Sequence, residues 1–299
     1  MISTEDLTRF SSLELRARGI VEGFLQGLHR SPFVGFSVEF SSHRRYEPGD
    51  DLRHVNWKVY ARQRKLYVKE FDAETNMNLY LLVDNTRSMQ CKSGGAMTKH
   101  EYATTLAASM AHLGLRQHDA VALGMLGDGV EAYLDPSSKP GQWDDCLQML
   151  SQSARGQKTS LKRALEQSAM LAKHRGLVIL MSDLVDEHDA DATEGFQRGI
   201  GQLRHRGHEV VVFHILDPWE RRLPESGRCR FLDLETPWEV TTEIGSIRRA
   251  YMERVDQWCS QLETICHDNG VDRIELTTDT PPGRALVDYL VRRTAMGGA

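Results

Sequence analysis

The sequence of 299 residues contains no apolar run that approaches the roughly 18 residues of a membrane-spanning helix. Its first ten residues also lack the basic start and apolar centre of a signal peptide. Only five cysteines are present, scattered and without a Cys-x-x-Cys pair, which favours reduced thiols over a disulfide framework. These absences predict a cytoplasmic protein without a membrane span.

Positive charge is not in excess, because 37 Lys and Arg residues stand against 42 Asp and Glu residues, for a net charge of -5. This balance does not favour a general nucleic-acid binder, so we expect no nucleic-acid partner. The His-Glu-x-x-His and Gly-x-Ser-x-Gly signatures of common hydrolases are also missing. Apolar content of 40% and charged content of 26% are ordinary for a globular chain.

From residue 78 onward, apolar strands alternate with helical patterns. This alternation predicts an α/β fold with a doubly wound, mostly parallel sheet flanked by helices. The expected strands are 79–83, 120–126, 130–134, 177–183, 209–216 and 271–277, with a hairpin formed by 229–234 and 238–242. The expected helices are 98–115, 142–150, 161–174, 193–206, 244–269 and 283–295.

The residues before this pattern are predicted to form an N-terminal elaboration, 1–75, of the main domain, 76–299. It should begin with a helix and continue as strand, helix and strand. The two strands alternate polar and apolar residues, and we expect them to pair with each other. The expected elements are helix 13–29, strand 36–40, helix 52–60 and strand 66–71.

Two of the apolar strands run directly into an acidic residue, Asp84 and Asp183. Open α/β sheets bind ligands beyond the carboxyl ends of their strands. Thr86 and Ser88 follow Asp84 at i+2 and i+4, and Thr159 stands at the start of a later helix. Such oxygen donors suit Mg²⁺, Mn²⁺ or Ca²⁺ better than zinc, although the same residue types also cap helices and turns.

This constellation resembles the metal-ion-dependent adhesion site (MIDAS) of von Willebrand factor A-like domains, in which D-x-S-x-S is completed by a distant Thr and a distant Asp. Thr86 replaces the first Ser of that motif and keeps its hydroxyl. The resemblance implies one bound Mg²⁺, with Mn²⁺ or Ca²⁺ as alternatives, and an open coordination position for an acidic group of a protein partner. The implied metal ligands are Asp84, Thr86, Ser88, Thr159 and Asp183.

The stretch upstream of the metal motif is similar to the signature of a MoxR-associated von Willebrand factor A-like family, the bacterial domain of unknown function 58 family. Its members are typically encoded beside MoxR-type AAA+ ATPases. The resemblance implies a protein-binding adaptor or chaperone-like partner of such an ATPase, without established catalysis. The residues that carry it are Glu39-Phe40, the run from Arg44 to Lys58, and Ala61-Arg62.

Basic residues are concentrated between positions 43 and 69, with acidic residues among them. Phosphate binding requires clustered, exposed positive charge, so we expect this segment to form ion pairs or to border a protein interface. The residues that we expect to contact the partner are Arg87, Arg44, Arg45, Arg53 and Lys58.

An alternative function is a metal-dependent hydrolase, either a phosphatase or a nuclease, that uses Asp84, Asp183 and the acidic stretch 186–191. Such enzymes need carboxylates that bridge two ions. A run of acids after a strand is more often a solvated loop. The sequence therefore favours a binding module that is not an enzyme.

Overall fold

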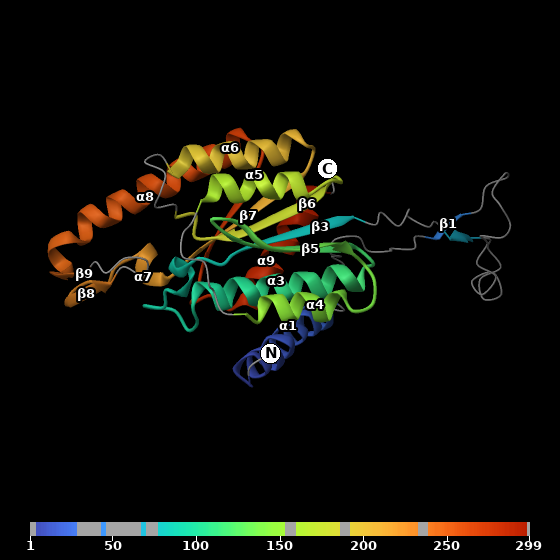
Figure 1. Cartoon of the computed structure of the whole chain (residues 1–299), viewed down its shortest axis with the longest axis horizontal. Helices are drawn as coiled ribbons and strands as arrows, with labels where there is room; N and C mark the ends of the chain where they lie inside the picture. The colour runs from blue at the N-terminus through green and yellow to red at the C-terminus, as the bar shows by residue number, and fades with distance from the viewer. Residues whose placement is uncertain are drawn as a thin grey trace.

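The protein is described here from a computed structural model, in which a six-stranded sheet forms the centre of the fold (Figure 1). The strand order is β10-β7-β6-β3-β4-β5, and every neighbouring pair is parallel except β4 and β5. The strands are β3 (Asn78–Asp84), β4 (Ala120–Gly127), β5 (Gly129–Ser137), β6 (Gly176–Ser182), β7 (Glu209–Leu216) and β10 (Asp272–Thr277). The structure describes residues 4–28, 43–45, 67–69, 77–152, 160–185, 192–232 and 239–297.

Helices cover both faces of this sheet, as Figure 1 shows. One face is covered by α1 (Thr4–Leu28), α3 (Lys99–Arg116), α4 (Gln142–Leu150) and α9 (Pro282–Gly297). The other face is covered by α5 (Leu161–Leu171), α6 (Ala192–His205) and α8 (Ile244–Asp268). The predicted α/β architecture, a mostly parallel sheet between two layers of helices, is therefore confirmed.

The apolar run of β3 explains why this strand lies in the middle. Successive side chains of a strand point to opposite faces of the sheet. Leu79 and Leu81 accordingly pack into the core under α3, while Tyr80 and Leu82 pack into the core under α5 and α6. A strand whose two faces are both apolar is stable only between two helical layers.

The chain adds strands to the sheet on both sides of β3, so the topological switch point lies at this strand. The chain adds β4 on one side of β3 and later returns to add β6 on the other side. Because β3 and β6 are parallel neighbours, with Val83 opposite Met181, their carboxyl ends meet at one edge of the sheet. Ligands of doubly wound proteins bind at such a switch point.

Strand β5 and one short helix differ from the sequence prediction for identifiable reasons. Strand β5 continues to Ser137, beyond the predicted end at residue 134, and includes Pro136. Proline removes a backbone donor, but β5 lies at the edge of the sheet, where that loss is tolerated. A short helix, α7 (Pro218–Arg221), was not predicted; Asp217 caps it.

The N-terminal helix α1 belongs to the main core, since Leu13, Ala17, Val21 and Phe24 are buried with residues of α3 and β3. Their spacing places them on one side of the helix. The predicted division of the chain at residues 75 and 76 stays a prediction.

Strand β2 (Tyr67–Lys69) lies within the predicted strand 66–71 and pairs antiparallel with β1 (His43–Arg45). The sequence indicated residues 36–40 as its partner, so the pairing with β1 was not foreseen. Residues 36–40 and the predicted helix 52–60 lie outside the described residues.

The predicted hairpin is confirmed: β8 (Arg228–Leu232) and β9 (Glu239–Glu243) form a separate two-stranded antiparallel sheet. It lies beside α7 and the start of α8 (Figure 1). Within the described ranges, no helix is both long and apolar enough to cross a membrane.

Candidate metal site at the carboxyl edge of the sheet

Asp84 lies at the end of β3, is buried, and accepts hydrogen bonds on both carboxylate oxygens. Thr86 donates to Oδ1 through its backbone N–H, at 3.0 Å, and through its hydroxyl, at 2.7 Å. Ser182, at the end of β6, donates its hydroxyl to Oδ2 at 2.6 Å. The carboxylate is thus held in one orientation by both strands of the switch point.

The two hydroxyls of the motif form a chain that ends on this carboxylate. Thr86 has one hydroxyl proton, which it gives to Asp84. The contact of 3.0 Å between the Thr86 and Ser88 hydroxyls must therefore be donated by Ser88. The three residues that follow the D-x-T-x-S spacing do converge. Ser88 lies in η2 (Arg87–Gln90), a short 3-10 helix that turns the chain back over the end of the strand.

Asp183 follows β6 directly and is fully buried. Its Oδ1 accepts from the backbone N–H of Val185 at 3.1 Å. Its Oδ2 accepts from the ammonium group of Lys99 at 2.7 Å. Burial and the charge of Asp183 raise the pKa of Asp84 above its ordinary value, so the two acids influence each other.

Lys99 is a component of the site that the sequence reading missed. Its side chain is 1% exposed and bridges Asp183 and Glu220, the latter at 2.6 Å. Burial alone would lower the pKa of Lys99, but the charges of both carboxylates raise it well above its usual range. The lysine is therefore a fixed cation inside the candidate site.

A weak signal for Lys99 existed in the sequence. Thr98 and Glu101 form a capping box that fixes the start of α3, so Lys99 is the first residue of the helix. A positive side chain there opposes the positive end of the helix dipole. Such a placement needs nearby acids, and Asp183 with Glu220 supply them from distant parts of the chain.

Asp217 is a second missed residue and organises the loop between the metal motif and α3. Its buried carboxylate accepts from the backbone N–H groups of Ser93, Gly94 and Gly95 at 2.9 to 3.1 Å. The N–H of Trp219 donates to the same group at 2.9 Å. A side chain at Gly94 would have its Cβ 2.4 Å from the Trp219 ring, so only glycine permits this approach.

The remaining predicted residues are distributed as follows. Thr159, the fifth implied metal ligand, lies outside the described residues, as do Arg53 and Lys58. Arg44 and Arg45 belong to β1, but the structure does not describe their side chains. Arg87 is exposed at the start of η2, next to the candidate site. The acidic stretch 186–191 of the hydrolase alternative also lies outside the described residues.

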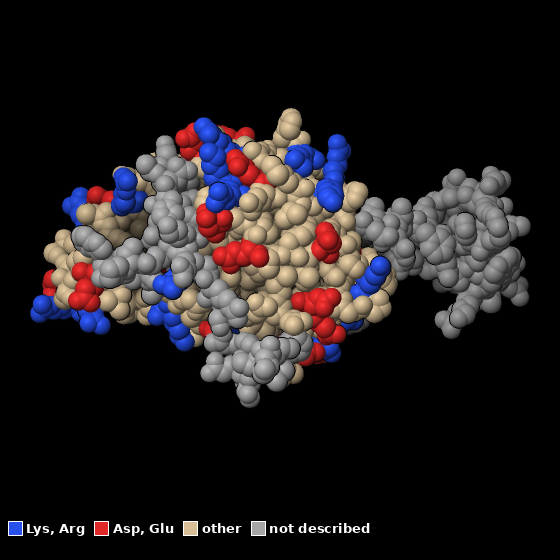
Figure 2. Space-filling view, in the orientation of Figure 1, with Lys and Arg blue, Asp and Glu red and all other residues tan. Residues whose placement is uncertain are grey.

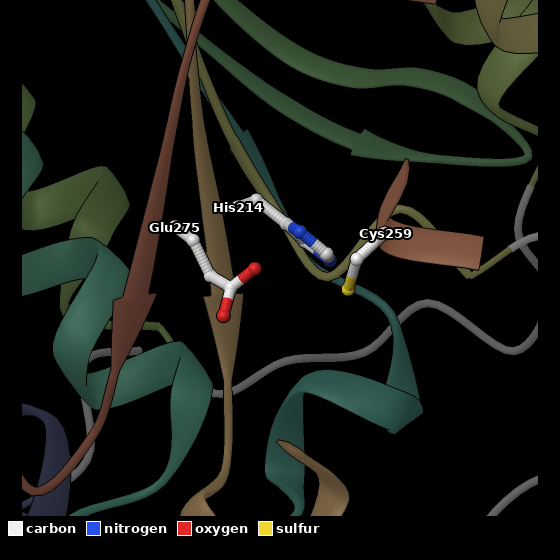
Figure 3. Close-up of side chains that lie close together, drawn as sticks. All are labelled: His214, Cys259 and Glu275. Atoms are coloured by element: carbon white, nitrogen blue, oxygen red, sulfur yellow. The ribbon is translucent and has the colours of Figure 1, made fainter. Parts of the chain in front are cut away.

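A second group of potential metal ligands lies behind the site. His214 on β7, Cys259 on α8 and Glu275 on β10 point toward one another (Figure 3), with ligand atoms within 4.8 Å. Nε2 of His214 lies 3.1 Å from the Asp183 carbonyl oxygen and must donate to it. Nδ1 then has a lone pair, which accepts from Arg273 at 2.7 Å.

The potential ligand atoms of this second group are already engaged, so they are not available to bind a metal ion. Arg221 donates to Glu275 at 2.6 Å, and Arg273 adds a second guanidinium beside the same carboxylate. Burial and the charge of Glu275 raise the pKa of Cys259, which keeps its thiol protonated. A cation would meet two positive charges and a neutral thiol. We therefore read the group as a structural network that fixes the backbone of Asp183.

The family described as "Protein of unknown function DUF58" matches residues 42–259 of the chain. The chain belongs to this family. A protein of Mycobacterium tuberculosis, described as uncharacterized, is similar to this chain. The two are 24% identical over 229 residues, which cover 75% of this chain and 69% of the relative. YeaD of Bacillus subtilis is 31% identical over 87 residues, which cover 29% of this chain and 20% of YeaD.

The chain is also similar to solved structures at low sequence identity. An aerotolerance-related membrane protein from Bacteroides fragilis is 12% identical, with a TM-score of 0.49 over 74% of this chain and 99% of that one. The VWA domain of SpRpn10 is 9% identical, with a TM-score of 0.43 over 71% of this chain and 94% of that domain. Likeness at this level concerns the fold alone.

Proposed function

We propose that this member of the DUF58 family is a non-enzymatic binding module that holds an acidic group of a protein partner at a Mg²⁺ site of the MIDAS type. It would act in the cytoplasm as an adaptor or chaperone-like partner of a MoxR-type AAA+ ATPase. The ATPase partner is what the family resemblance implies, whereas the cytoplasmic location is the expectation from the scattered cysteines. The convergence of Asp84, Thr86 and Ser88 supports the metal site.

One observation carries the proposal. Asp84 is a buried carboxylate, bound by hydroxyls and one N–H, and no Lys or Arg of the described residues pairs with it. A buried charge without a partner is costly, and a cation beside it removes that cost. The Thr86 and Ser88 hydroxyls add the neutral oxygens that a hard cation needs.

The charge balance of the site also suits a divalent ion. Three carboxylates meet here, those of Asp84, Asp183 and Glu220, and Lys99 supplies one positive charge. When all are ionised, two negative charges remain. A bound Mg²⁺ would supply two positive charges and an open position for a carboxylate of the partner. Asp84, Thr86, Ser88 and Asp183 would hold it, with Thr159 as the expected fifth ligand.

The test is thermal unfolding in EDTA and in Mg²⁺. At a Mg²⁺ concentration of about 100 Kd the ion should stabilise the folded chain by about 2.7 kcal/mol, which raises Tm by several degrees. Asp84→Ala should abolish this shift because it removes the central carboxylate.

Asp119→Ala is the matched control. Asp119 is another buried aspartate, but it precedes β4 and therefore lies at the opposite edge of the sheet. It should retain the shift of the wild type. An equal response to Mg²⁺ in Asp84→Ala and Asp119→Ala would remove the metal site from the proposal. Binding of the MoxR-type ATPase that persists in EDTA would remove the role of the ion in partner capture.

A further inference from the structure

A groove of about 790 Å³ opens beside the candidate metal site. Ser88, Lys99 and Asp183 are among its lining residues. Strand β8 also lines it, together with Trp219 of α7. The volume lies in the range of sites that bind ligands, and its position makes it the natural path to the metal residues.

The groove collects exposed apolar side chains. The described residues include eight large apolar side chains that are exposed, and four of them line this one groove. Exposed apolar surface gathered in one place marks an interaction site more often than scattered single residues do. The four side chains are Val185, Trp219, Phe231 and Leu232.

Strand β8 meets the groove along its edge. All five consecutive residues of β8, Arg228–Leu232, line the groove. Successive side chains of a strand point to opposite faces, so a groove that touches every residue runs along the edge of the strand. In the part of the chain that the structure describes, β8 pairs with β9 alone. Its other edge therefore offers backbone N–H and C=O groups that an added strand can pair with.

The charge around the groove favours an acidic ligand. Lys92, Arg228 and Arg230 stand among its lining residues, and Arg230 lies 3.9 Å from Glu239 on β9. The nearby carboxylates of Asp183 and Glu220 are already engaged by Lys99. Figure 2 shows Lys and Arg side chains, with Asp and Glu side chains among them, at the end of the molecule formed by β8, β9 and α8.

We propose that an extended, acidic segment of a partner protein adds to the free edge of β8. Its apolar side chains would contact Trp219, Phe231 and Leu232, and an acidic side chain between them would reach Ser88 and Asp183. This inference deepens the proposed function and rests on it for the role of that one acidic side chain. The pairing with β8 and the apolar contacts are inferred from the residues that line the groove and do not depend on the metal ion.

The probe is a display library of random peptides, about eight residues long to match the span of a five-residue strand and its flanks. The library is selected on the full chain in Mg²⁺, and the enriched peptide is synthesised for affinity measurement. We expect enriched sequences with Asp or Glu next to apolar residues at alternate positions. A copy of the peptide with N-methyl groups on alternate amides should bind at least about tenfold more weakly, because it cannot complete the strand pairing.

Two matched variants locate the binding surface. Leu232→Asp places a negative charge in the groove at a side chain that is 54% exposed. Val291→Asp places the same charge on α9 at a side chain that is 51% exposed. We expect a loss of about tenfold or more in peptide affinity for Leu232→Asp. Val291→Asp should bind as the wild type does.

The outcomes separate this inference from the proposed function. The groove would not be the binding surface if the peptide bound Leu232→Asp and Val291→Asp with equal affinity. The same conclusion would follow if the N-methylated peptide bound as tightly as the unmodified one, even if Mg²⁺ still stabilises the chain. The inference would also be wrong if the library enriched no peptide, or if the chain formed a dimer that the Leu232→Asp substitution dissociates. Conversely, peptide binding that depends on Leu232 but not on Mg²⁺ or Asp84 would retain the groove and refute the metal-centred function.

Discussion

Replacement of Lys99 by methionine tests the electrostatics of the site most directly. Methionine preserves most of the side-chain length and removes the ammonium group. In the wild type that group donates to Asp183 at 2.7 Å and to Glu220 at 2.6 Å. In Lys99→Met the fully buried carboxylate of Asp183 keeps only the backbone donor of Val185.

The expected decrease in the free energy of unfolding of Lys99→Met is large. Removal of one partner from a buried ion pair costs about 3–5 kcal/mol, because the remaining charge is left uncompensated. The free energy of unfolding of an ordinary domain is about 5–15 kcal/mol, so Lys99→Met should lose a large share of its stability in EDTA. The same loss adds a net negative charge to the site. Mg²⁺ should therefore stabilise Lys99→Met more than it stabilises the wild type.

Urea unfolding in EDTA and in Mg²⁺ measures both effects. Lys92→Met is the control, since Lys92 is an exposed lysine on the loop that precedes α3 and its loss should change stability by less than about 0.5 kcal/mol. If Lys99→Met matches Lys92→Met in EDTA, the buried ion pair does not stabilise the fold. If Mg²⁺ stabilises Lys99→Met no more than the wild type, the charge of Lys99 does not affect the binding of the metal ion.

Asp217→Asn should lower the free energy of unfolding by about 1–3 kcal/mol, because its four backbone N–H donors lose a charged acceptor; urea unfolding equal to the wild type would contradict this. Burial and the charge of Arg273 lower the pKa of His214 to about 4, from about 6.5 in the unfolded chain. Stability from the neutral ring is therefore complete above about pH 6.5 and is lost as the pH falls toward 4, by about 3 kcal/mol in all. His214→Gln should remove this slope from unfolding curves recorded in EDTA against pH. The comparison with the wild type cancels the opposite slope of Asp84, whose raised pKa favours the folded state at low pH.

The elements of the sheet could be predicted from the sequence because their signals are local. The run before Asp84 is apolar at every position, which only a strand buried on both faces requires. The turn at Asp128-Gly129 connects β4 to β5 as expected. The predicted strand 130–134 stops short of Pro136, which β5 includes, because the sequence does not reveal which strand lies at the edge of the sheet.

The site was predictable only in part, for a physical reason. Asp84, Thr86 and Ser88 are close in sequence, so their spacing alone brings them together. Lys99 and Glu220 are 121 positions apart, and their contact depends on the order of the strands, which no local pattern encodes. The ion pair between Lys99 and Glu220 could therefore be identified only from the three-dimensional structure.

The family match ends well inside the chain, at residues 42 and 259. A fragment cut at those limits would lose α1, β10 and α9. Phe24 from the first helix and Leu286 from the last lie in one apolar cluster with β3, and the two helices touch. Both flanks of the matched region therefore pack with the strand that carries Asp84, and a truncated fragment would keep only α3 and α4 on that face of the sheet.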